Sequence, residues 1–288
     1  MNPVLPDEAL ELAAAAAKAF DGAEDVAAVL DALGIGDLDP RADEVSAAAA
    51  AALCEVAGRV ALPYPLAGAL VRDAEGRPTA AVPDSVARVD HGDRFPQWRV
   101  GTFGGAAHLA GGGRPLGSKL GPHVCYLELG KPIDLPEADL LLQQTLVAWT
   151  VLGALDRAME LAVEHVNGRI QFGKPLAAFQ AVQFQLADAA VAVAGLRELA
   201  GFTLWRGGRA DVLALRLHAC EVARTVLRTA QQLHGAAGVC DEYDVSVLTR
   251  YVQPLIRLPF GADRAAAELA ASAMADGFDG LFPHGGTR

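Results

Sequence analysis

The sequence predicts a mainly α-helical protein with a small β domain between two helical parts. Residues 1–61 are rich in alanine and have helical spacing, and residues 62–135 are rich in proline and glycine and contain short β-like runs. Residues 136–288 return to long apolar helical patterns. Because 52% of the 288 residues are hydrophobic and 20% are charged, the chain can bury a sizeable core in one or two domains.

The N-terminal part, residues 1–61, is expected to form about three helices. Its alanine-rich run from Pro6 to about Val60 is interrupted by Gly34-Ile35-Gly36 and by Asp39-Pro40, and glycine and proline mark helix ends. From residue 62 to 135 the helical periodicity disappears. The runs VARVD, WRVGT, AAHLA and VCYLEL, separated by turn residues, predict short strands.

The C-terminal part, residues 136–288, is expected to be a bundle of long helices. The first helix should cover Glu137 to Asn167, about 46 Å at about 1.5 Å per residue, and is apolar around most of its first half. A second should begin near Pro175, which the first helical turn tolerates, and end near Leu204. A third should run from Ala210 to His234 and stop at Gly235.

Composition and charge exclude several function classes. The net charge is −11 and no lysine- or arginine-rich block occurs, so we expect no nucleic acid partner. The longest uncharged stretch, Leu140 to Leu155, is shorter than a membrane span and contains glutamine and threonine, so we expect a buried helix and no membrane. The opening MNPVLPDEAL lacks the features of a signal peptide. Four scattered cysteines without a CxxC pair indicate reduced thiols in a cytoplasm and no metal site.

The stretch GRIQFGKPLAAFQAVQFQLAD, residues 168–188, lies where the first long helix stops and the second begins. Arg169 lies beside backbone N–H groups at a helix start, and its guanidinium is suited to a phosphate or pyrophosphate. Two interpretations stay open from the residues alone. Arg169 either binds such an anion or caps the last carbonyls of the preceding helix, with Phe172 and Phe179 then serving as core residues.

This stretch resembles the signature of the acyl-CoA dehydrogenase family, an R-x-x-F-G turn followed by a glutamine-containing helix that ends in L-A-[DE]. A second match lies about 60 residues later, in QQLHGAAGVCDEYDVSVLTR, residues 231–250, which is similar to the family's Q-[IL]-x-G-G segment, with Ala236 in place of the second glycine. The resemblance covers about Leu135 to Ala271 well. It implies N-terminal helices, a middle β-domain and a C-terminal four-helix bundle, with FAD as the cofactor.

In this family the flavin ring lies between the middle β-domain and the C-terminal helices of one subunit, while its pyrophosphate and adenosine reach the neighbouring subunit. The resemblance therefore implies that Arg169 and Phe172 meet a neighbour's flavin nucleotide, and that Gln232 and the backbone around Gly235 hold its pyrophosphate. Gln180 and Gln183 are expected to pin helix contacts or the adenosine edge. His234 either donates to the diphosphate or caps its own helix.

The departures from the family pattern concern the catalytic base. The family places its glutamate either after the E-Y-D segment or near the start of the first C-terminal helix, and here these places hold LIRLPFGADR, residues 255–264, and the amides Gln143 and Gln144. An amide is not basic near neutral pH. Glu137 and Asp139 are the nearest acids and would need a shift of about one helical turn, so we expect no catalytic residue in this chain.

The middle and N-terminal parts are also depleted relative to the family. The flavin-lining strand motifs of the middle domain are missing between Arg72 and Leu135, where Trp98 is expected to be core and Ser118 a turn residue, and the N-terminal helical part is short. The chain therefore resembles the base-lacking subunit of actinobacterial α2β2 acyl-CoA dehydrogenases of steroid side-chain degradation, as does its segment GRVALPYPL.

The leading hypothesis is a non-catalytic subunit of a heteromeric, FAD-dependent acyl-CoA dehydrogenase. The resemblance implies that a paralogous partner supplies the glutamate base and most of the acyl-CoA pocket, that the substrate is a bulky, steroid-derived acyl-CoA, and that FAD is shared at the interface. Two alternatives stay open, which are a flavin-free hydratase or dehydratase of the same fold and a scaffold protein without catalysis.

Overall fold

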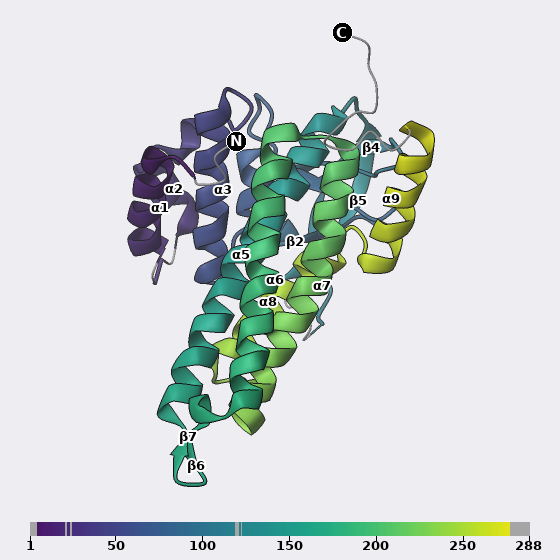
Figure 1. Cartoon of the computed structure of the whole chain (residues 1–288). Helices are drawn as coiled ribbons and strands as arrows, with labels where there is room; N and C mark the ends of the chain where they lie inside the picture. The colour runs from purple at the N-terminus through teal and green to yellow at the C-terminus, as the bar shows by residue number, and fades with distance from the viewer. Residues whose placement is uncertain (1–4, 21, 24, 119–120, 122, 277–288) are drawn as a thin grey trace.

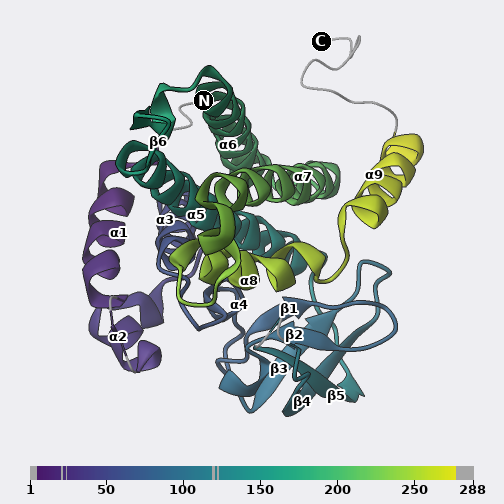
Figure 2. The same ribbon diagram turned by 90° about the horizontal axis from the view of Figure 1, so that it is seen from below.

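The computed structural model describes residues 5–276 apart from 21, 24, 119–120 and 122. Residues 1–4 and 277–288, which the predicted N-terminal and C-terminal domains include, lie outside the described residues. Long helices run side by side through the molecule, with the N-terminal helices against one side (Figure 1). The strands lie together beyond α8 when the molecule is seen along the bundle (Figure 2). The predicted fold class, mainly α with a small β domain, is confirmed.

The N-terminal part consists of α1 (Asp7–Phe20), α2 (Val26–Ala32), a short 3-10 helix (Ile35–Asp37) and α3 (Glu44–Arg59), so the prediction of three helices is confirmed. Aspartates define two of the helix starts. The carboxylate of Asp25 accepts a hydrogen bond from the Ala28 N–H at 3.1 Å, and that of Asp43 accepts one from the Ser46 N–H at 2.7 Å. Each such cap satisfies a backbone donor that the helix leaves free.

The β part contains α4 (Leu66–Leu70) and five strands: β1 (Thr79–Ala81), β2 (Arg88–Asp90), β3 (Gln97–Gly101), β4 (Ala107–Pro115) and β5 (Val124–Pro132). Their order in the sheet is β1-β3-β4-β5-β2, with β1 parallel to β3 and the other pairs antiparallel. The four runs predicted as strands are confirmed, and Trp98 is core as expected. Sequence periodicity missed α4 and β1 because elements of five and three residues are too short to show a period.

The C-terminal part begins with α5 (Glu137–Gly168) and continues, after the hairpin of β6 (Ile170–Gln171) and β7 (Lys174–Pro175) and a 3-10 turn (Leu176–Ala178), with α6 (Gln180–Arg206). The predicted helix start near Pro175 is wrong by five residues. Phe172 and Gly173 both have positive φ and form the hairpin turn, and Pro175 is extended at ψ 146°. The chain then continues through α7 (Arg209–His234), a 3-10 turn (Gly235–Val239), α8 (Asp244–Arg257) and α9 (Ala262–Asp276).

Helix α5 is the central element of the core. It is long and apolar enough to cross a membrane by length and composition, yet 83% of its apolar window is buried inside the protein. The prediction that Leu140 to Leu155 form a buried helix is confirmed. Alanines of α1 and α3 and leucines of α5 and α7 pack in one continuous cluster around it.

Two glycines allow α3 to approach α5 unusually closely. A Cβ added at Gly58 would lie 1.9 Å from the carbonyl oxygen of Thr150, and one added at Gly153 would lie 1.8 Å from the carbonyl oxygen of Glu55. Both obstacles are backbone atoms of the other helix, so no side chain can move aside. The two helix backbones touch at these glycines, and this contact fixes the N-terminal helices against the bundle.

We expect Gly153→Ala to destabilise the protein by about 1–3 kcal/mol or more, because overpacking of a rigid contact forces the backbones apart. Gly168→Ala in the same helix is the matched control. A Cβ there meets nothing within 4 Å, so the substitution should be neutral or stabilise by up to about 1 kcal/mol. Urea unfolding of both variants measures the difference, and equal stabilities would contradict the close contact.

Candidate functional site

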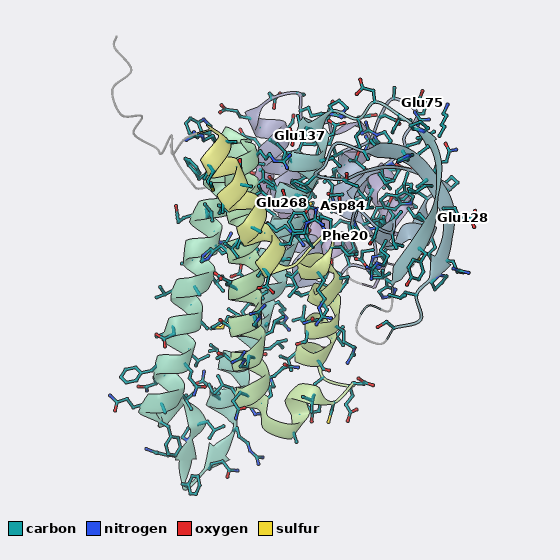
Figure 3. All side chains as sticks on the ribbon, turned by 90° about the vertical axis from the view of Figure 1, so that its right-hand side faces the viewer. Phe20, Glu75, Asp84, Glu128, Glu137 and Glu268 are labelled. Atoms are coloured by element: carbon teal, nitrogen blue, oxygen red, sulfur yellow. The ribbon has the colours of Figure 1, made fainter. Side chains whose placement is uncertain are left out.

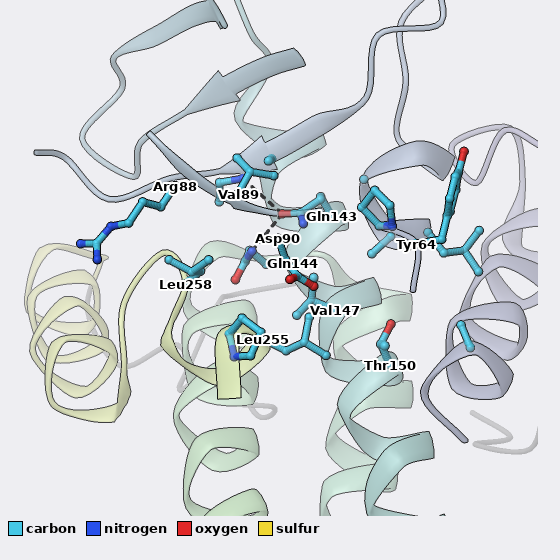
Figure 4. A pocket seen from close by; sticks show the side chains of 18 of the residues that line it. Tyr64, Arg88, Val89, Asp90, Gln143, Gln144, Val147, Thr150, Leu255 and Leu258 are labelled. Atoms are coloured by element: carbon cyan, nitrogen blue, oxygen red, sulfur yellow. Dashed lines mark hydrogen bonds between the residues drawn. The ribbon is translucent and has the colours of Figure 1, made fainter. Parts of the chain in front are cut away.

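A small cavity lies where α4, β1 and β2 face α5 and α8. Its volume is 60 Å³, and its walls are mostly apolar (Figure 4). Polar groups reach it from three elements: Gln143 and Gln144 from α5, Arg88 and Asp90 from β2, and Tyr251 from α8. Burial, followed by the nearby charge of Asp90, raises the pKa of Tyr251 well above its ordinary value, so the phenol stays protonated.

The two glutamines are fixed in a buried hydrogen-bond chain that joins three parts of the fold. The Gln143 side-chain oxygen accepts from the Ala81 N–H at 3.4 Å and from the Gln144 amide at 2.9 Å (Figure 4). The Gln144 oxygen in turn accepts from Arg216 of α7 at 2.8 Å. The amides at the expected base position are therefore structural donors and acceptors in this chain.

Arg216 is a buried cation whose hydrogen-bond acceptors are all neutral. Its Nε donates to the Phe260 carbonyl at 2.8 Å, a second nitrogen donates to the same oxygen, and the third reaches Gln144 and the Leu255 carbonyl. Burial lowers the pKa of Arg216 to about 10, so the guanidinium remains charged near neutral pH. The segment after α8, where some family members carry their glutamate, is held by this arginine.

The two acids nearest to the expected base position do not line the cavity. Glu137 pairs with Arg209, which also reaches Glu268 of α9, and the two carboxylates lie near each other at the outside of the molecule (Figure 3). Asp139 is buried and pairs with Arg99 at 3.0 Å and with Arg41 at 3.2 Å. Both carboxylates lie at the start of α5, and each neutralises arginines that come from other parts of the chain.

Asp90 is a cavity-lining carboxylate that the sequence reasoning missed. One of its oxygens lies 3.0 Å from Nδ1 of His91, and the other is buried without a hydrogen bond to the described residues. The signal was present, since VARVD was predicted to be a strand, but alternation alone does not say which face of that strand meets α5. The cavity around Asp90 has a volume of 60 Å³, which is room for small molecules such as water.

The opposite end of α5 carries the residues of the first family motif. Arg169 is the C-terminal cap residue of α5, and its N–H donates to the His165 carbonyl at 2.9 Å. Its guanidinium is exposed and has neither a hydrogen bond nor an ion pair with any residue that the structure describes. Arg169 therefore caps α5 through its backbone N–H and not through its side chain, and the anion-binding interpretation of the guanidinium stays a prediction.

Phe172 occupies the tip of the β6–β7 hairpin, which projects beyond the ends of the helices (Figure 1). Its side chain is 92% exposed and its φ is +52°, a conformation that bulky residues rarely adopt. The interpretation of Phe172 as a core residue is wrong. Phe179 is half-buried beneath the hairpin, meets Phe172 edge-on at 6.2 Å, and lies under the Lys174 ammonium.

The glutamines of this stretch have different surroundings. Gln183 donates to the Ala177 carbonyl at 2.9 Å and so pins the turn before α6, as one of the two interpretations proposed. Gln180 is the first residue of α6 and is exposed, as is Gln185. A role of Gln180 at an adenosine edge stays a prediction.

The end of α7 brings the second motif to the same end of the bundle. His234 stacks on His165 of α5 with ring centroids 4.4 Å apart, so the end of α7 lies against the end of α5. Gln232 is exposed, and Gly235 ends α7 with φ +63°. His234 Nδ1 bonds the Ala230 carbonyl at 2.7 Å, so this nitrogen contacts its own helix, as the helix-capping interpretation expects. His165 was missed because no motif position marked it.

No metal site is evident in the described part of the chain. No group of three or more His, Cys, Asp and Glu side chains there could hold an ion. The four cysteines are free thiols, three of them buried, and burial raises the pKa of Cys54 to about 12. Burial also raises the pKa of Cys125 and Cys220, so these three buried thiols stay protonated at neutral pH.

Comparison with known proteins agrees with the fold and with both motifs. Residues 135–275 match the family model described as the acyl-CoA dehydrogenase, C-terminal domain. The chain is also 32% identical over 100 residues to the acyl-CoA dehydrogenase IpdE2 of Mycobacterium tuberculosis. That alignment covers 35% of this chain and 31% of IpdE2, so the chain matches about a third of the length of this curated relative.

Two solved structures with similar folds are heteromeric complexes by their names. A chain of the ChsE4-ChsE5 complex from Mycobacterium tuberculosis superposes with a TM-score of 0.75 at 19% identity, over 96% of this chain and 99% of that chain. The Tcur3481-Tcur3483 steroid ACAD has a TM-score of 0.75 at 21% identity, over 95% and 100%. Residues 135–275 are therefore similar to the C-terminal domain of acyl-CoA dehydrogenases, and the chain has the fold of these solved neighbours.

We expect Phe172→Gly to leave the free energy of unfolding unchanged or raise it by up to about 1 kcal/mol, because glycine relieves the left-handed backbone and little burial is lost. Phe20→Ala is the contrasting control. Phe20 is buried in the core, and its truncation should cost about 3–5 kcal/mol. A loss of more than about 1 kcal/mol for Phe172→Gly, measured by urea unfolding, would show that Phe172 stabilises the isolated chain.

Proposed function

We propose that this chain is a non-catalytic subunit of a heteromeric, FAD-dependent acyl-CoA dehydrogenase. In the assembly it contributes phosphate contacts to a flavin whose ring and substrate are held by a paralogous chain. The acyl-CoA is bulky and steroid-derived, since the Tcur3481-Tcur3483 neighbour is named a steroid ACAD. An α2β2 assembly in the cytoplasm follows from the same resemblance.

One observation carries the proposal, which is the distance between the two candidate regions along α5. Gln144 lies at the small cavity and Arg169 follows the far end of the helix, 25 residues later, or about 37 Å at about 1.5 Å per residue. A dinucleotide is shorter than this distance. A flavin nucleotide held by Arg169 therefore has its reactive ring outside this chain's own cavity.

The two regions also differ in their fit to FAD. The cavity of 60 Å³ is far smaller than the about 300–1,000 Å³ typical of a site for a molecule of drug size, so it does not fit a flavin ring. The outer end presents the exposed guanidinium of Arg169 and the exposed Gln232 amide, which suit a diphosphate, whereas the Gly235 N–H already donates to the Gln232 carbonyl. Arg169, Phe172, Gln232 and Gly235, with His234 and Gln180 at the margin, would hold the nucleotide half.

When bound, FAD supplies hydride acceptance for α,β-dehydrogenation of an acyl thioester. The residues of this chain act on binding alone, because the amides at the expected base position are bonded to each other and to Arg216. Proton abstraction then falls to a carboxylate of the partner. The same fold without flavin could host a hydratase or dehydratase, and a scaffold would need no ligand, so the experiments below separate all three.

We expect the chain expressed alone to contain little FAD and to show no acyl-CoA dehydrogenation, and to form a yellow, active complex when it is co-expressed with a paralogous dehydrogenase chain. Absorbance in the flavin bands measures the FAD content, and size-exclusion chromatography measures the assembly. A yellow and active homo-oligomer would overturn the subunit proposal. Thioester hydration by the colourless chain would instead establish the hydratase, and an inactive complex without flavin would favour the scaffold.

The Arg169→Ala variant of the same complex locates the phosphate contact. Loss of a hydrogen bond to a charged group should weaken FAD binding by about 1.5–3 kcal/mol while the complex still assembles. Arg157→Ala is the matched control, because Arg157 lies on the same helix and pairs with Glu160 on its outer surface. Equal FAD content in the two variants would remove Arg169 from the site.

Asp90 provides the test of the missing base. We expect Asp90→Asn to leave kcat of the assembled complex within a few-fold, because the cavity around Asp90 is too small for an acyl thioester. Removal of a true general base typically costs about 10² to 10⁴ in rate. Steady-state kinetics with flavin content measured in parallel decide the matter, and a large loss of kcat at full flavin occupancy would place the base in this chain.

A further inference from the structure

His165 and His234 form a stacked pair beside Arg169. Their ring centroids are 4.4 Å apart and the rings are inclined by 28°, with His165 on α5 and His234 on α7. Arg169 follows His165 by one helical turn and bonds its carbonyl. Three groups that can carry positive charge are therefore gathered where two helices end, and both rings are half-buried.

The hydrogen bond of His234 fixes what its other nitrogen can do. The Ala230 carbonyl carries no proton, so Nδ1 of His234 must be the donor in their 2.7 Å contact. In the neutral ring Nε2 is then an acceptor, and its lone pair repels an anion. Only the imidazolium form donates from Nε2, so His234 binds a phosphate oxygen only after it has taken up a proton.

The surroundings disfavour the protonated form of His165 while the site is empty. Burial, the neighbouring His234 and then Arg169 lower the pKa of His165. No carboxylate among the described residues lies within 4 Å of either ring. The acids within the second motif, Asp241, Glu242 and Asp244, are exposed, and Asp241 pairs with Arg250. The other packed segments bring Lys174, whose ammonium lies over the Phe179 ring, and the uncharged turn Gly235–Val239.

We propose that anion binding at Arg169 is coupled to proton uptake by the His165–His234 pair, which is a second, proton-linked part of the phosphate site. The inference rests on the proposed function for the position of the diphosphate. Two negative charges beside the pair stabilise an imidazolium that the empty site disfavours. Because the pKa is higher in the bound state, affinity is greatest below the pKa of the empty site and declines as the pH rises through the pKa of the bound state.

The experiment uses the complex of this chain with the paralogous chain, freed of FAD, and ADP-ribose, a diphosphate diester whose charge does not change near neutral pH. Calorimetric titration at about pH 6 and about pH 8 should show binding about three- to tenfold tighter at the lower pH, as expected for a rise of about half to one pKa unit on binding. In parallel, NMR titration of the histidine ring protons should show the pKa of the pair rising when ADP-ribose is added.

The double variant His165→Gln/His234→Gln should bind ADP-ribose with the same affinity at both pH values. His218→Gln is the matched control. His218 lies on α7 sixteen residues before His234, or about 24 Å away, and its loss should leave the pH dependence unchanged. Pair protons that do not respond to ADP-ribose, or a double variant that keeps the wild-type pH dependence, would overturn the proposal.

Arg169→Ala separates this inference from the proposed function. If the diphosphate site is correct, the variant binds ADP-ribose more weakly at both pH values. Unchanged binding by Arg169→Ala would overturn the proposed phosphate contact, even if the histidines titrate on binding. Loss of pH dependence in the double variant, together with weaker binding by Arg169→Ala, supports both the proton-linked site and the proposed phosphate contact. No binding of ADP-ribose at any pH overturns both proposals.

Discussion

The whole fold depends on the burial of α5 against the N-terminal helices. At Gly58 and Gly153 the backbones of α3 and α5 are in contact, and α6, α7 and α8 pack on the rest of the helix. An apolar helix of this length is stable in water only when it is covered, so these neighbours are required for it to exist. Its burial also places Gln143 and Gln144 at one end and His165 and Arg169 at the other, in fixed positions.

The buried polar groups at the cavity end form a closed hydrogen-bond chain. Arg216 satisfies the Phe260 carbonyl and the Gln144 amide, and Gln144 satisfies Gln143. A carboxylate in place of Gln144 would face the buried Arg216 and form an ion pair, which would lower the pKa of that carboxylate and weaken it as a base. The amides instead give neutral packing between the sheet and the bundle. This end of α5 is consistent with a structural role.

Long elements and their order could be predicted from the sequence, because α3, α5 and α7 repeat their apolar positions over many turns. The start of α6 could not, since Pro175 fits both a first helical turn and an extended hairpin residue, and the positive φ of Phe172 decided between them. The positions of Arg169 and His234 followed from motif resemblance. His165 and Asp90 could not be placed, because only the packing of α5 on α7 and of β2 on α5 shows which side chains meet.

The glutamine chain at one end of α5 and the Arg169 turn at the other differ in whether their polar groups find partners inside the protein. At the cavity end, Gln143, Gln144 and Arg216 find their partners inside the chain. At the outer end, Phe172 is exposed in a left-handed conformation and Arg169 is exposed with no partner among the described residues. Neither feature stabilises the isolated chain, and unfavourable local choices without internal compensation are expected at functional sites. Both groups are exposed and free to contact another molecule, which is what the proposed nucleotide site shared between two chains needs.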